Sequence, residues 1–312
     1  MLWILGIIAA AAILVLLVSY ICFDMAFKAK PDPGRDEEYP IPPGKAYEPH
    51  RPVMMEWMDK TRQLPSREFS ITSFDGLKLC GKYYECQPGA PIELMLHGYR
   101  GLAERDLCGG VQRCFRLGRN ALLVDQRACG KSQGKVITFG IRERRDCLDW
   151  VQLLIREFGS DVKIILTGIS MGASTVLMAS AMELPENVIG IIADCGFTSP
   201  KAIIKKVIGQ MKLPANLAYP FVKLGARLYG GFDLEEASAI EAIKKCRVPV
   251  FLAHGEADDY VPYEMSLENF AACTAPKRLL TVPDTGHGLC YITAREKYLE
   301  VRRDIEKEYN LP

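Results

Sequence analysis

Residues 163–182 read KIILTGISMGASTVLMASAM, and this stretch decides the fold. An apolar run typical of a buried strand ends at Thr167, and a helical pattern begins at Ala173. Between them lies the sequence Gly168-Ile-Ser170-Met-Gly172. Glycines two residues before and two after a serine let strand and helix approach closely around a strained turn that exposes the hydroxyl. We therefore predict that Ser170 is a nucleophile at the carboxyl end of a parallel strand.

Short β-rich runs alternate with longer amphipathic runs from about Arg67 onward. Strands are expected at residues 68–73, 77–85, 92–96, 121–124, 163–167, 188–193, 248–253 and 278–282. The last six are nearly continuous in apolar residues, as parallel strands buried on both faces are. The first two are joined through Asp75-Gly76 and are typical of a hairpin. The predicted fold class is α/β, a mostly parallel eight-stranded sheet flanked by helices.

Two helical patterns follow the sixth strand, where a single crossover helix would suffice. They cover residues 201–211 and 215–229, are broken at Pro214, and carry large apolar residues at helical spacing. Open α/β sheets bind ligands at the carboxyl ends of their strands, so we expect a small helical cap there, at about residues 199–235. Ordinary core packing would give the same pattern.

The N-terminus carries an uncharged run of 22 residues from Leu2 to Phe23. This is about the length that a helix needs to cross a hydrocarbon layer, so residues 1–23 are predicted to be a single transmembrane anchor. A cleaved signal peptide is the alternative, but no basic segment precedes the run and no small-x-small site follows it. Lys28, Lys30 and Arg35 follow the run, which favours a cytoplasmic catalytic domain.

The segment after the anchor is rich in proline. Residues 31–52 contain seven prolines and two glycines, a composition that disfavours packed secondary structure. We therefore expect a linker and lead-in over residues 24–66 and the catalytic domain over residues 67–312.

Composition excludes several classes of function. With 39 basic and 38 acidic side chains the formal charge is +1, and no clustered basic stretch suggests a nucleic-acid partner. The 11 cysteines are scattered through apolar runs without a Cys-x-x-Cys pair, which favours buried, reduced thiols over a zinc site or a disulfide framework. Cys80 and Cys86 flank a predicted strand, so a bridge between them stays open.

A carboxylate and a histidine complete the pattern around Ser170. Residues 254–262 read HGEADDYVP directly after the strand at 248–253, and Gly286-His287-Gly288 follows the last strand. The chain order is then serine, aspartate, histidine. Of the four histidines, only His287 lies after the acid; His50 is in the expected linker, and His97 and His254 each precede a glycine at a strand end.

Asp258 is the predicted acid. Asp259 is adjacent to it but would point differently from the same turn, and Asp194 ends the preceding strand. Asp194 is another place from which a carboxylate reaches the histidine, although we expect it to support the cap loop instead.

The chain resembles the α/β-hydrolase superfamily over roughly Arg67 to Tyr309. Residues 96–101, LHGYRG, are similar to its HGxxG segment. Residues 125–134, DQRACGKSQG, are similar to its DxRGxGxSxG segment, with Ala128 where glycine is usual, and residues 254–262 to its HGxxDxxVP segment. The similarity extends to branches with monoacylglycerol-lipase-like and prolyl-aminopeptidase-like enzymes and to small bacterial esterases.

The resemblance implies an oxyanion hole made by the backbone amides of Tyr99 and Met171. It also implies a serine hydrolase that cleaves a small-molecule carboxylic ester or thioester through an acyl-enzyme on Ser170, with no metal or organic cofactor. The alternatives are a peptidase or amidase with the same triad and a non-catalytic, membrane-tethered scaffold. Gly130-Lys131-Ser132 is no phosphate-binding loop, because Asp125 stands where such a loop needs its first glycine.

Overall fold

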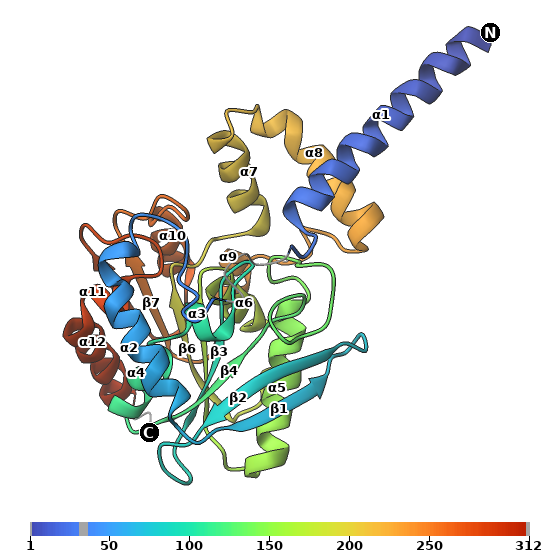
Figure 1. The fold of residues 1–312 in the computed structure, drawn as a ribbon. Helices are drawn as coiled ribbons and strands as arrows, with labels where there is room; N and C mark the ends of the chain where they lie inside the picture. The colour runs from blue at the N-terminus through green and yellow to red at the C-terminus, as the bar shows by residue number, and fades with distance from the viewer. Residues whose placement is uncertain (1, 31–36, 310–312) are drawn as a thin grey trace.

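The computed structural model describes residues 2–30 and 37–309 (Figure 1). Met1, residues 31–36 of the predicted linker, among them Arg35, and the last three residues of the predicted domain lie outside the described parts. Eight strands form one sheet in the order β1-β2-β4-β3-β5-β6-β7-β8. β2 runs antiparallel to β1 and β4, and every other pair is parallel, which confirms the predicted fold class. The strands are β1 (Arg67–Thr72), β2 (Lys78–Tyr84), β3 (Ile92–Leu96), β4 (Asn120–Val124), β5 (Ile164–Ile169), β6 (Val188–Asp194), β7 (Val250–Gly255) and β8 (Lys277–Val282).

Helices cover both faces of the sheet. One face carries α5 (Glu143–Phe158), α6 (Met171–Ala179), α9 (Ala239–Ile243) and α10 (Glu264–Ala272). The other carries α2 (Arg51–Arg62), α4 (Gly110–Arg116), α11 (Cys290–Thr293) and α12 (Arg295–Glu308). The short α3 (Ala103–Asp106) follows β3, and a 3₁₀ turn, η1 (Glu48–His50), precedes α2.

The core forms because the central strands are buried along their whole length. Every residue of β3, β4 and β7 is buried. Successive side chains alternate between the two faces: Leu94 and Leu96 pack toward α5 and α6, whereas Met95 packs toward α4. The nearly continuous apolar runs of these strands are therefore what a sheet covered on both sides requires.

The predicted helical cap is confirmed. Two helices lie above the carboxyl ends of the strands (Figure 1). They are α7 (Pro200–Gln210) and α8 (Ala215–Gly225), and the π-helical turn η2 (Ala226–Gly230) continues α8. Ser199 caps α7, because its hydroxyl accepts a hydrogen bond from the Ala202 N–H. Pro214 separates the two helices, as the sequence indicated.

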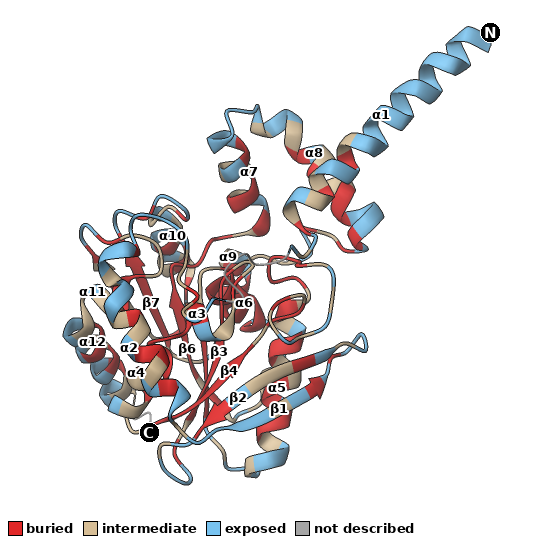
Figure 2. Ribbon diagram, in the orientation of Figure 1, coloured by how far each residue is buried: buried red, intermediate tan, exposed pale blue. Residues whose placement is uncertain are grey.

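α1 (Leu2–Ala26) is the one described helix that is long and apolar enough to cross a membrane. Membrane anchors and signal sequences both have this length and composition. Its first part is exposed, whereas its last turns pack against α8 and η2 (Figure 2). Ser19 and Phe23 are buried, and the chain beyond the helix pairs with residues 135–137 through hydrogen bonds of Ala29 and Phe27.

Part of the segment 24–66, which was predicted to be a linker and lead-in, packs against the domain. α2 lies in this segment and buries Met54, Trp57 and Met58 in the core that α12 covers. These three side chains share one face because they are three and four residues apart, which overrides the proline-rich composition around them. Part of the expected lead-in thus packs as a layer of the domain, while the division at residue 67 stays a prediction.

Candidate active site

Ser170 occupies a strained turn between β5 and α6. Its φ is +56° and its ψ is −118°, a conformation that side chains with a Cβ rarely adopt. Its N–H donates to the Asp194 carbonyl at 2.8 Å, which holds the turn against β6. A Cβ on Gly172 would overlap the carbonyl of Leu96, and one on Gly168 would overlap the backbone of Gly172. Both glycines are therefore needed for the helix to start this close to the sheet.

The structure brings the predicted nucleophile, base and acid together. Ser170 Oγ lies 2.8 Å from His287 Nε2, and His287 Nδ1 lies 2.6 Å from Asp258 Oδ2. The three residues follow β5, β7 and β8, whose carboxyl ends lie on one edge of the sheet. Because Nδ1 faces a carboxylate, it carries the proton, and Nε2 is left to accept the hydrogen bond of the serine hydroxyl.

Asp258 is held as an ionised acceptor. Burial alone would raise its pKa, but hydrogen bonds from His254, from His287 and from the Val261 N–H outweigh burial and hold the pKa well below its usual value. Oδ1 accepts from the backbone N–H groups of Tyr260 and Val261, each at 2.9 Å. Both oxygens are thus fixed, and one of them faces His287.

The two other candidate acids are placed differently. Asp259 is exposed, and its carbonyl accepts hydrogen bonds from Lys206 and Gln210 of the cap. Asp194 is buried, and its side chain borders a small cavity shared with Arg113 and Tyr298. The expectation that Asp194 supports the cap loop was wrong, because its carboxyl lies on the α12 side of the sheet; burial raises its pKa to about 6.

His254 is a supporting residue that the sequence did not identify. It is fully buried, with Nδ1 2.6 Å from Ser266 Oγ and Nε2 3.1 Å from Asp258 Oδ2. Nε2 is also 2.9 Å from the Val261 carbonyl, so it carries the proton, and Nδ1 accepts from the serine hydroxyl. His254 and His287 therefore both contact Oδ2 of Asp258 and hold it in place.

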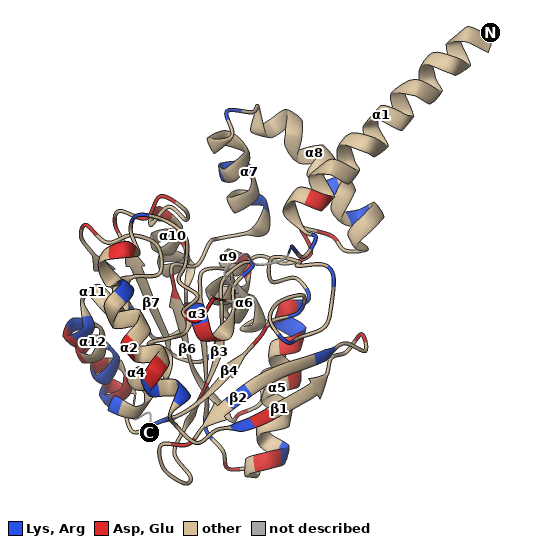
Figure 3. Cartoon of the chain, in the orientation of Figure 1, with Lys and Arg blue, Asp and Glu red and all other residues tan. Residues whose placement is uncertain are grey.

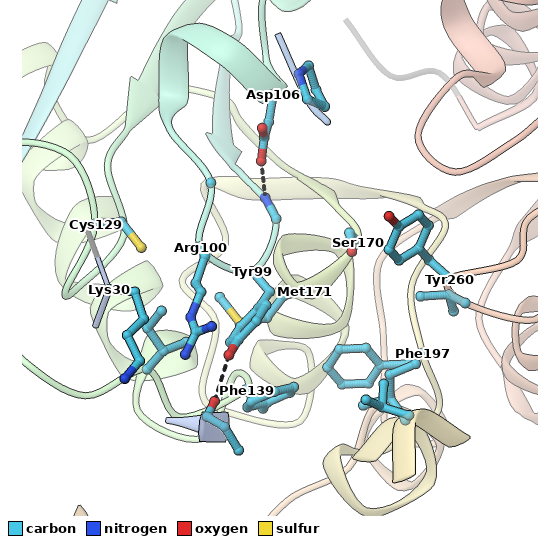
Figure 4. Close-up of a pocket in the computed structure, with 18 of the residues that line it drawn as sticks. Lys30, Tyr99, Arg100, Asp106, Cys129, Phe139, Ser170, Met171, Phe197 and Tyr260 are labelled. Carbon is cyan, nitrogen blue, oxygen red and sulfur yellow. Dashed lines mark hydrogen bonds between the residues drawn. The ribbon is translucent and has the colours of Figure 1, made fainter. Parts of the chain in front are cut away.

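His97 supports the segment predicted to form the oxyanion hole. Its Nε2 accepts from the Gln126 N–H at 2.9 Å, so Nδ1 carries the proton that faces the Gly98 carbonyl at 2.8 Å. Asp106 accepts from the Gly98 N–H at 3.0 Å (Figure 4). The buried His97 and the partly buried Asp106 thus fix the backbone on both sides of the Gly98 peptide.

The predicted oxyanion donors lie beside the serine. A Cβ built on Gly98 would be 3.4 Å from Ser170 Cβ, which places the start of the Tyr99 segment next to the nucleophile. Met171 is the first residue of α6, where N–H groups have no partner within the helix. Within the described part of the chain, neither the Tyr99 N–H nor the Met171 N–H donates to another backbone group.

Tyr47 also reaches the site, from the segment expected to be linker. Its hydroxyl donates to the His287 carbonyl at 3.0 Å, and burial raises the pKa of its phenol. Tyr260 lies against the imidazole of His287, with ring centroids 5.5 Å apart. The loop that carries His287 is therefore held by contacts on two sides.

Cys195, Asp258 and His287 form the one cluster of potential metal ligands found in residues 2–30 and 37–309. Asp258 Oδ2 already accepts two N–H groups, and His287 Nε2 faces Ser170 Oγ rather than an open position. Cys195 Sγ is 3.9 Å from His287 Nε2, and burial raises the pKa of its thiol. Because a metal requires deprotonated ligands with free lone pairs, the cluster fits proton transfer better than metal binding.

A cavity of about 1100 Å³ lies over the serine, between the sheet and the cap. Ser170, His287 and Tyr99 border its inner end, and Figure 4 shows Tyr260 beside the serine, with Phe139 and Phe197 farther along the cavity. Its outer end is lined by apolar side chains of α1, α7 and α8: Cys22, Met25, Ala26, Ile203, Ile204, Val207, Ile208, Ala218 and Val222. Asp106 is the one carboxylate among the described lining residues, and it is already bonded to Gly98 and Arg105.

Comparison with solved structures identifies the same fold. The esterase Pf2001 of Pyrococcus furiosus superposes with a TM-score of 0.63 at 23% identity, over 80% of this chain and 93% of that one. The acylaminoacyl peptidase of Pyrococcus horikoshii superposes with a TM-score of 0.59 at 17% identity, over 80% of this chain and 42% of that one. At these identities the likeness concerns the fold, which is that of the α/β hydrolases.

Comparison of sequences identifies the family. YqkD of Bacillus subtilis, an uncharacterized protein, is 29% identical over 195 residues, which are 62% of this chain and 64% of that protein. The match therefore spans slightly less than two thirds of that relative. The model of the prolyl oligopeptidase family matches residues 138–304, a range that contains Ser170, Asp258 and His287. The chain belongs to the prolyl oligopeptidase family of the α/β-hydrolase superfamily.

Proposed function

We propose that the protein is a serine hydrolase that cleaves a carboxylic ester or thioester through an acyl-enzyme on Ser170. The observation that carries this proposal is the continuous hydrogen-bonded series from Ser170 Oγ to His287 at 2.8 Å and from His287 to Asp258 at 2.6 Å. A hydroxyl on a strained turn, a histidine with its free nitrogen toward that hydroxyl and a buried carboxylate are what acyl transfer to serine requires.

In the proposed reaction, His287 Nε2 takes the hydroxyl proton as Ser170 Oγ attacks the substrate carbonyl carbon. The resulting imidazolium gives that proton to the departing alkoxide or thiolate, which leaves an ester on Ser170. Water then attacks this ester, transfers a proton to His287, and releases the carboxylic acid as the proton returns to Ser170 Oγ. Asp258 keeps its charge throughout and stabilises the imidazolium.

The backbone N–H groups of Tyr99 and Met171 are the proposed donors to the oxyanion. The start of α6 adds the positive end of the helix dipole at the same point. Each such donor is worth about 3 to 4 kcal/mol of transition-state stabilisation. The hydrogen bonds that Asp106 and His97 make to Gly98 support this role, because they hold the segment in place before substrate binds.

A peptidase is the second candidate, and the family to which the chain belongs favours it. Recognition of a free amino terminus would need an available carboxylate in the cavity. Among the described lining residues Asp106 is the one acid, and both of its oxygens are engaged. Apart from Lys30, Arg100, Arg105, Ser132 and the tyrosines, the remaining lining is apolar, which supports an acyl substrate instead.

The test is a panel of p-nitrophenyl esters of rising chain length beside aminoacyl p-nitroanilides, with the Ser170→Ala protein as control. We expect Ser170-dependent turnover of the esters. Turnover of the anilides alone would identify a peptidase. A fluorophosphonate probe separates an enzyme from a non-catalytic scaffold, because labelling that survives Ser170→Ala would refute the assigned nucleophile.

We also propose that α1 anchors the protein in a membrane with the catalytic domain in the cytoplasm. Lys28 and Lys30 follow the helix, and the cysteines of the chain are all free thiols, as in a reducing compartment. Cys80 and Cys86 are partly exposed. A thiol reagent that cannot cross membranes should leave both unlabelled in intact cells and label them after lysis, and labelling of intact cells would reverse the orientation.

A further inference from the structure

The cavity over Ser170 has an apolar mouth. Val207, Met211 and Leu213 of the cap and Met25 of α1 line the cavity, yet each is between 45% and 52% exposed. A residue that both lines a cavity and is exposed marks the opening, so the mouth lies between the end of α7 and α1. Exposed apolar rims of this kind are typical of surfaces that meet a lipid or another apolar partner.

The length of α1 fixes the position of this mouth relative to a bilayer. A hydrocarbon layer of about 30 Å takes about 20 helical residues at 1.5 Å each, so a span that begins at Leu2 ends near Ile21. The cap meets α1 within that range. Tyr229 Oη donates to the Leu16 carbonyl at 3.0 Å, and Gly225 lies directly against Ser19. These contacts lie two to five residues inside the end of the span, so η2 and the end of α8 lie at the outer edge of the hydrocarbon layer whenever α1 spans the membrane.

Two tyrosines occupy this level. The rings of Tyr20 and Tyr229 meet edge to face, with centroids 5.2 Å apart. Tyrosine is enriched at the boundary between hydrocarbon and head groups, where its ring and its hydroxyl are both accommodated. The cap also carries Leu217 and Leu228 on its outer surface, where they are 71% and 53% exposed and do not line the cavity.

The charge of the cap is complementary to an anionic lipid surface. Residues 200–230 contain six basic side chains and no acidic one, as the blue segments of α7 and α8 in Figure 3 illustrate. Lys201 and Lys223 pair with Glu235, and Arg227 pairs with Asp233, two acidic residues at the C-terminal end of the cap. Within residues 2–30 and 37–309, no acidic side chain forms an ion pair with Lys205, Lys206 or Lys212, and Lys206 donates to the carbonyls of Asp259 and Tyr260. A basic helix pair with exposed leucines is typical of a surface that lies on a membrane.

The end of α1 is also a wall of the active site. Tyr99 Oη donates to the Ala26 carbonyl at 2.8 Å (Figure 4). Arg100 donates to the carbonyls of Met25 at 2.8 Å and Lys28 at 3.1 Å. These carbonyls belong to the last turn of α1 and the residues after it, where a helix leaves acceptors without internal partners. The proposed oxyanion segment and the membrane helix are therefore bonded to each other.

We propose that the substrate of Ser170 is an ester or thioester of a long-chain acyl group that resides in the bilayer and enters the cavity laterally, between α7 and α1. The acyl chain lies along the apolar lining from α1, α7 and α8, and its carbonyl reaches Ser170 at the inner end. This inference rests on the proposed function of Ser170, and it adds the class of substrate and the direction from which it comes.

The test uses the full-length protein in lipid nanodiscs of phosphatidylcholine with phosphatidylglycerol. Two probes share one leaving group: 4-methylumbelliferyl palmitate placed in the disc and 4-methylumbelliferyl butyrate in solution. In the variant Leu217→Asp/Leu228→Asp, the ratio of the palmitate rate to the butyrate rate should fall at least tenfold. The matched control Leu267→Asp, on α10 and 38% exposed in the native protein, should keep the wild-type ratio. An unchanged ratio in the double variant would overturn lateral entry.

A second measurement needs no variant. Replacing phosphatidylglycerol by phosphatidylcholine should slow palmitate hydrolysis at least threefold and leave butyrate hydrolysis unchanged, because the basic cap loses the anionic lipid surface that it contacts. Equal palmitate rates in the two kinds of nanodisc would refute contact between the cap and the membrane.

The proposed function and the proposed lateral route fail in different ways. If butyrate is cleaved in a Ser170-dependent way while palmitate shows none of these effects, only the lateral route is wrong. If Ser170→Ala retains both activities, the proposed function itself is wrong.

Discussion

Replacing Asp258 by asparagine tests the proposed relay at the residue where the structure gives the clearest expectation. Oδ1 accepts two backbone N–H groups, from Tyr260 and Val261, and Oδ2 accepts from His287 and His254. Asparagine offers one oxygen and one NH₂ group, so only one of these two sides keeps its hydrogen bonds.

The asparagine oxygen should take the Oδ1 position. Turned the other way, the NH₂ group would face two fixed backbone donors, which costs about 1 kcal/mol for each lost hydrogen bond and more for leaving buried groups unpaired. With the oxygen on the backbone side, the NH₂ group donates to His287 Nδ1, and the imidazole proton moves to Nε2. That nitrogen then faces Ser170 Oγ as a donor and no longer accepts the hydroxyl proton.

The expected loss in kcat is about 10⁴-fold, as for the loss of the correct tautomer in a serine triad, or about 5 kcal/mol of transition-state stabilisation. The assay is ester hydrolysis, with thermal unfolding measured in parallel to establish that the variant is folded. The control is Asp259→Asn, because the exposed side chain of Asp259 takes no part in the triad hydrogen bonds; its rate should stay within about twofold of wild type. A folded Asp258→Asn protein with more than a tenth of wild-type kcat would refute the relay.

Three further predictions concern the surrounding structure. Burial raises the pKa of Asp194 to about 6, so ionisation of this carboxyl destabilises the native state as pH rises. In urea titrations, the free energy of unfolding of Asp194→Asn relative to wild type should therefore grow by up to about 3 kcal/mol between pH 4 and 7. A pH-independent difference between the two proteins would contradict this. Ala128 has a φ of +63°, so Ala128→Gly should raise the free energy of unfolding by about 1 kcal/mol and Tm by about 2 °C; a lower Tm would show that its strain is offset elsewhere. Gly172→Ala should abolish activity, because the new methyl overlaps the Leu96 carbonyl. Its control, Gly209→Ala, lies on an open face of α7 and should stabilise that helix by about 0.5 to 1 kcal/mol. An active Gly172→Ala enzyme would count against the close approach of α6 to the sheet.

The sheet was predictable because its strands are buried on both faces. β3 was predicted at its observed bounds, and the other strands within two residues at either end, because an unbroken apolar run has few other uses in a chain of this composition. The grouping of Ser170, Asp258 and His287 was predictable for a related reason. Each follows a predicted parallel strand, and the carboxyl ends of parallel strands share one edge.

The supporting histidines were not predictable in the same way. His97 and His254 carry the same local signal, a histidine before a glycine at a strand end, and their partners Gln126 and Ser266 come from other elements. Their position at the end of an apolar strand could have identified them as buried residues with hydrogen-bond partners. A histidine that continues a fully apolar strand has to be buried, and a buried imidazole needs partners for both nitrogens.

The segment before β1 was misleading because composition was weighed above spacing. Proline and glycine between residues 31 and 52 indicated an open chain, yet Met54, Trp57 and Met58 are three and four residues apart, which is the spacing of a helix with one apolar face. Tyr47 gave no signal at all, since its role depends on the His287 carbonyl 240 residues away in the chain.

The contacts between α1 and the active site support the proposed membrane anchor in a way that composition does not. Hydropathy over residues 2–23 is the same whether or not the last turns touch the domain. In the structure, Phe23 and Phe27 belong to the same core as Ile137 and Phe139, and Ala26 accepts a hydrogen bond from Tyr99. Cleavage within these turns would remove part of the cavity wall and expose that core to water. The last turns of the helix are therefore a structural part of the site, as the proposed anchor requires.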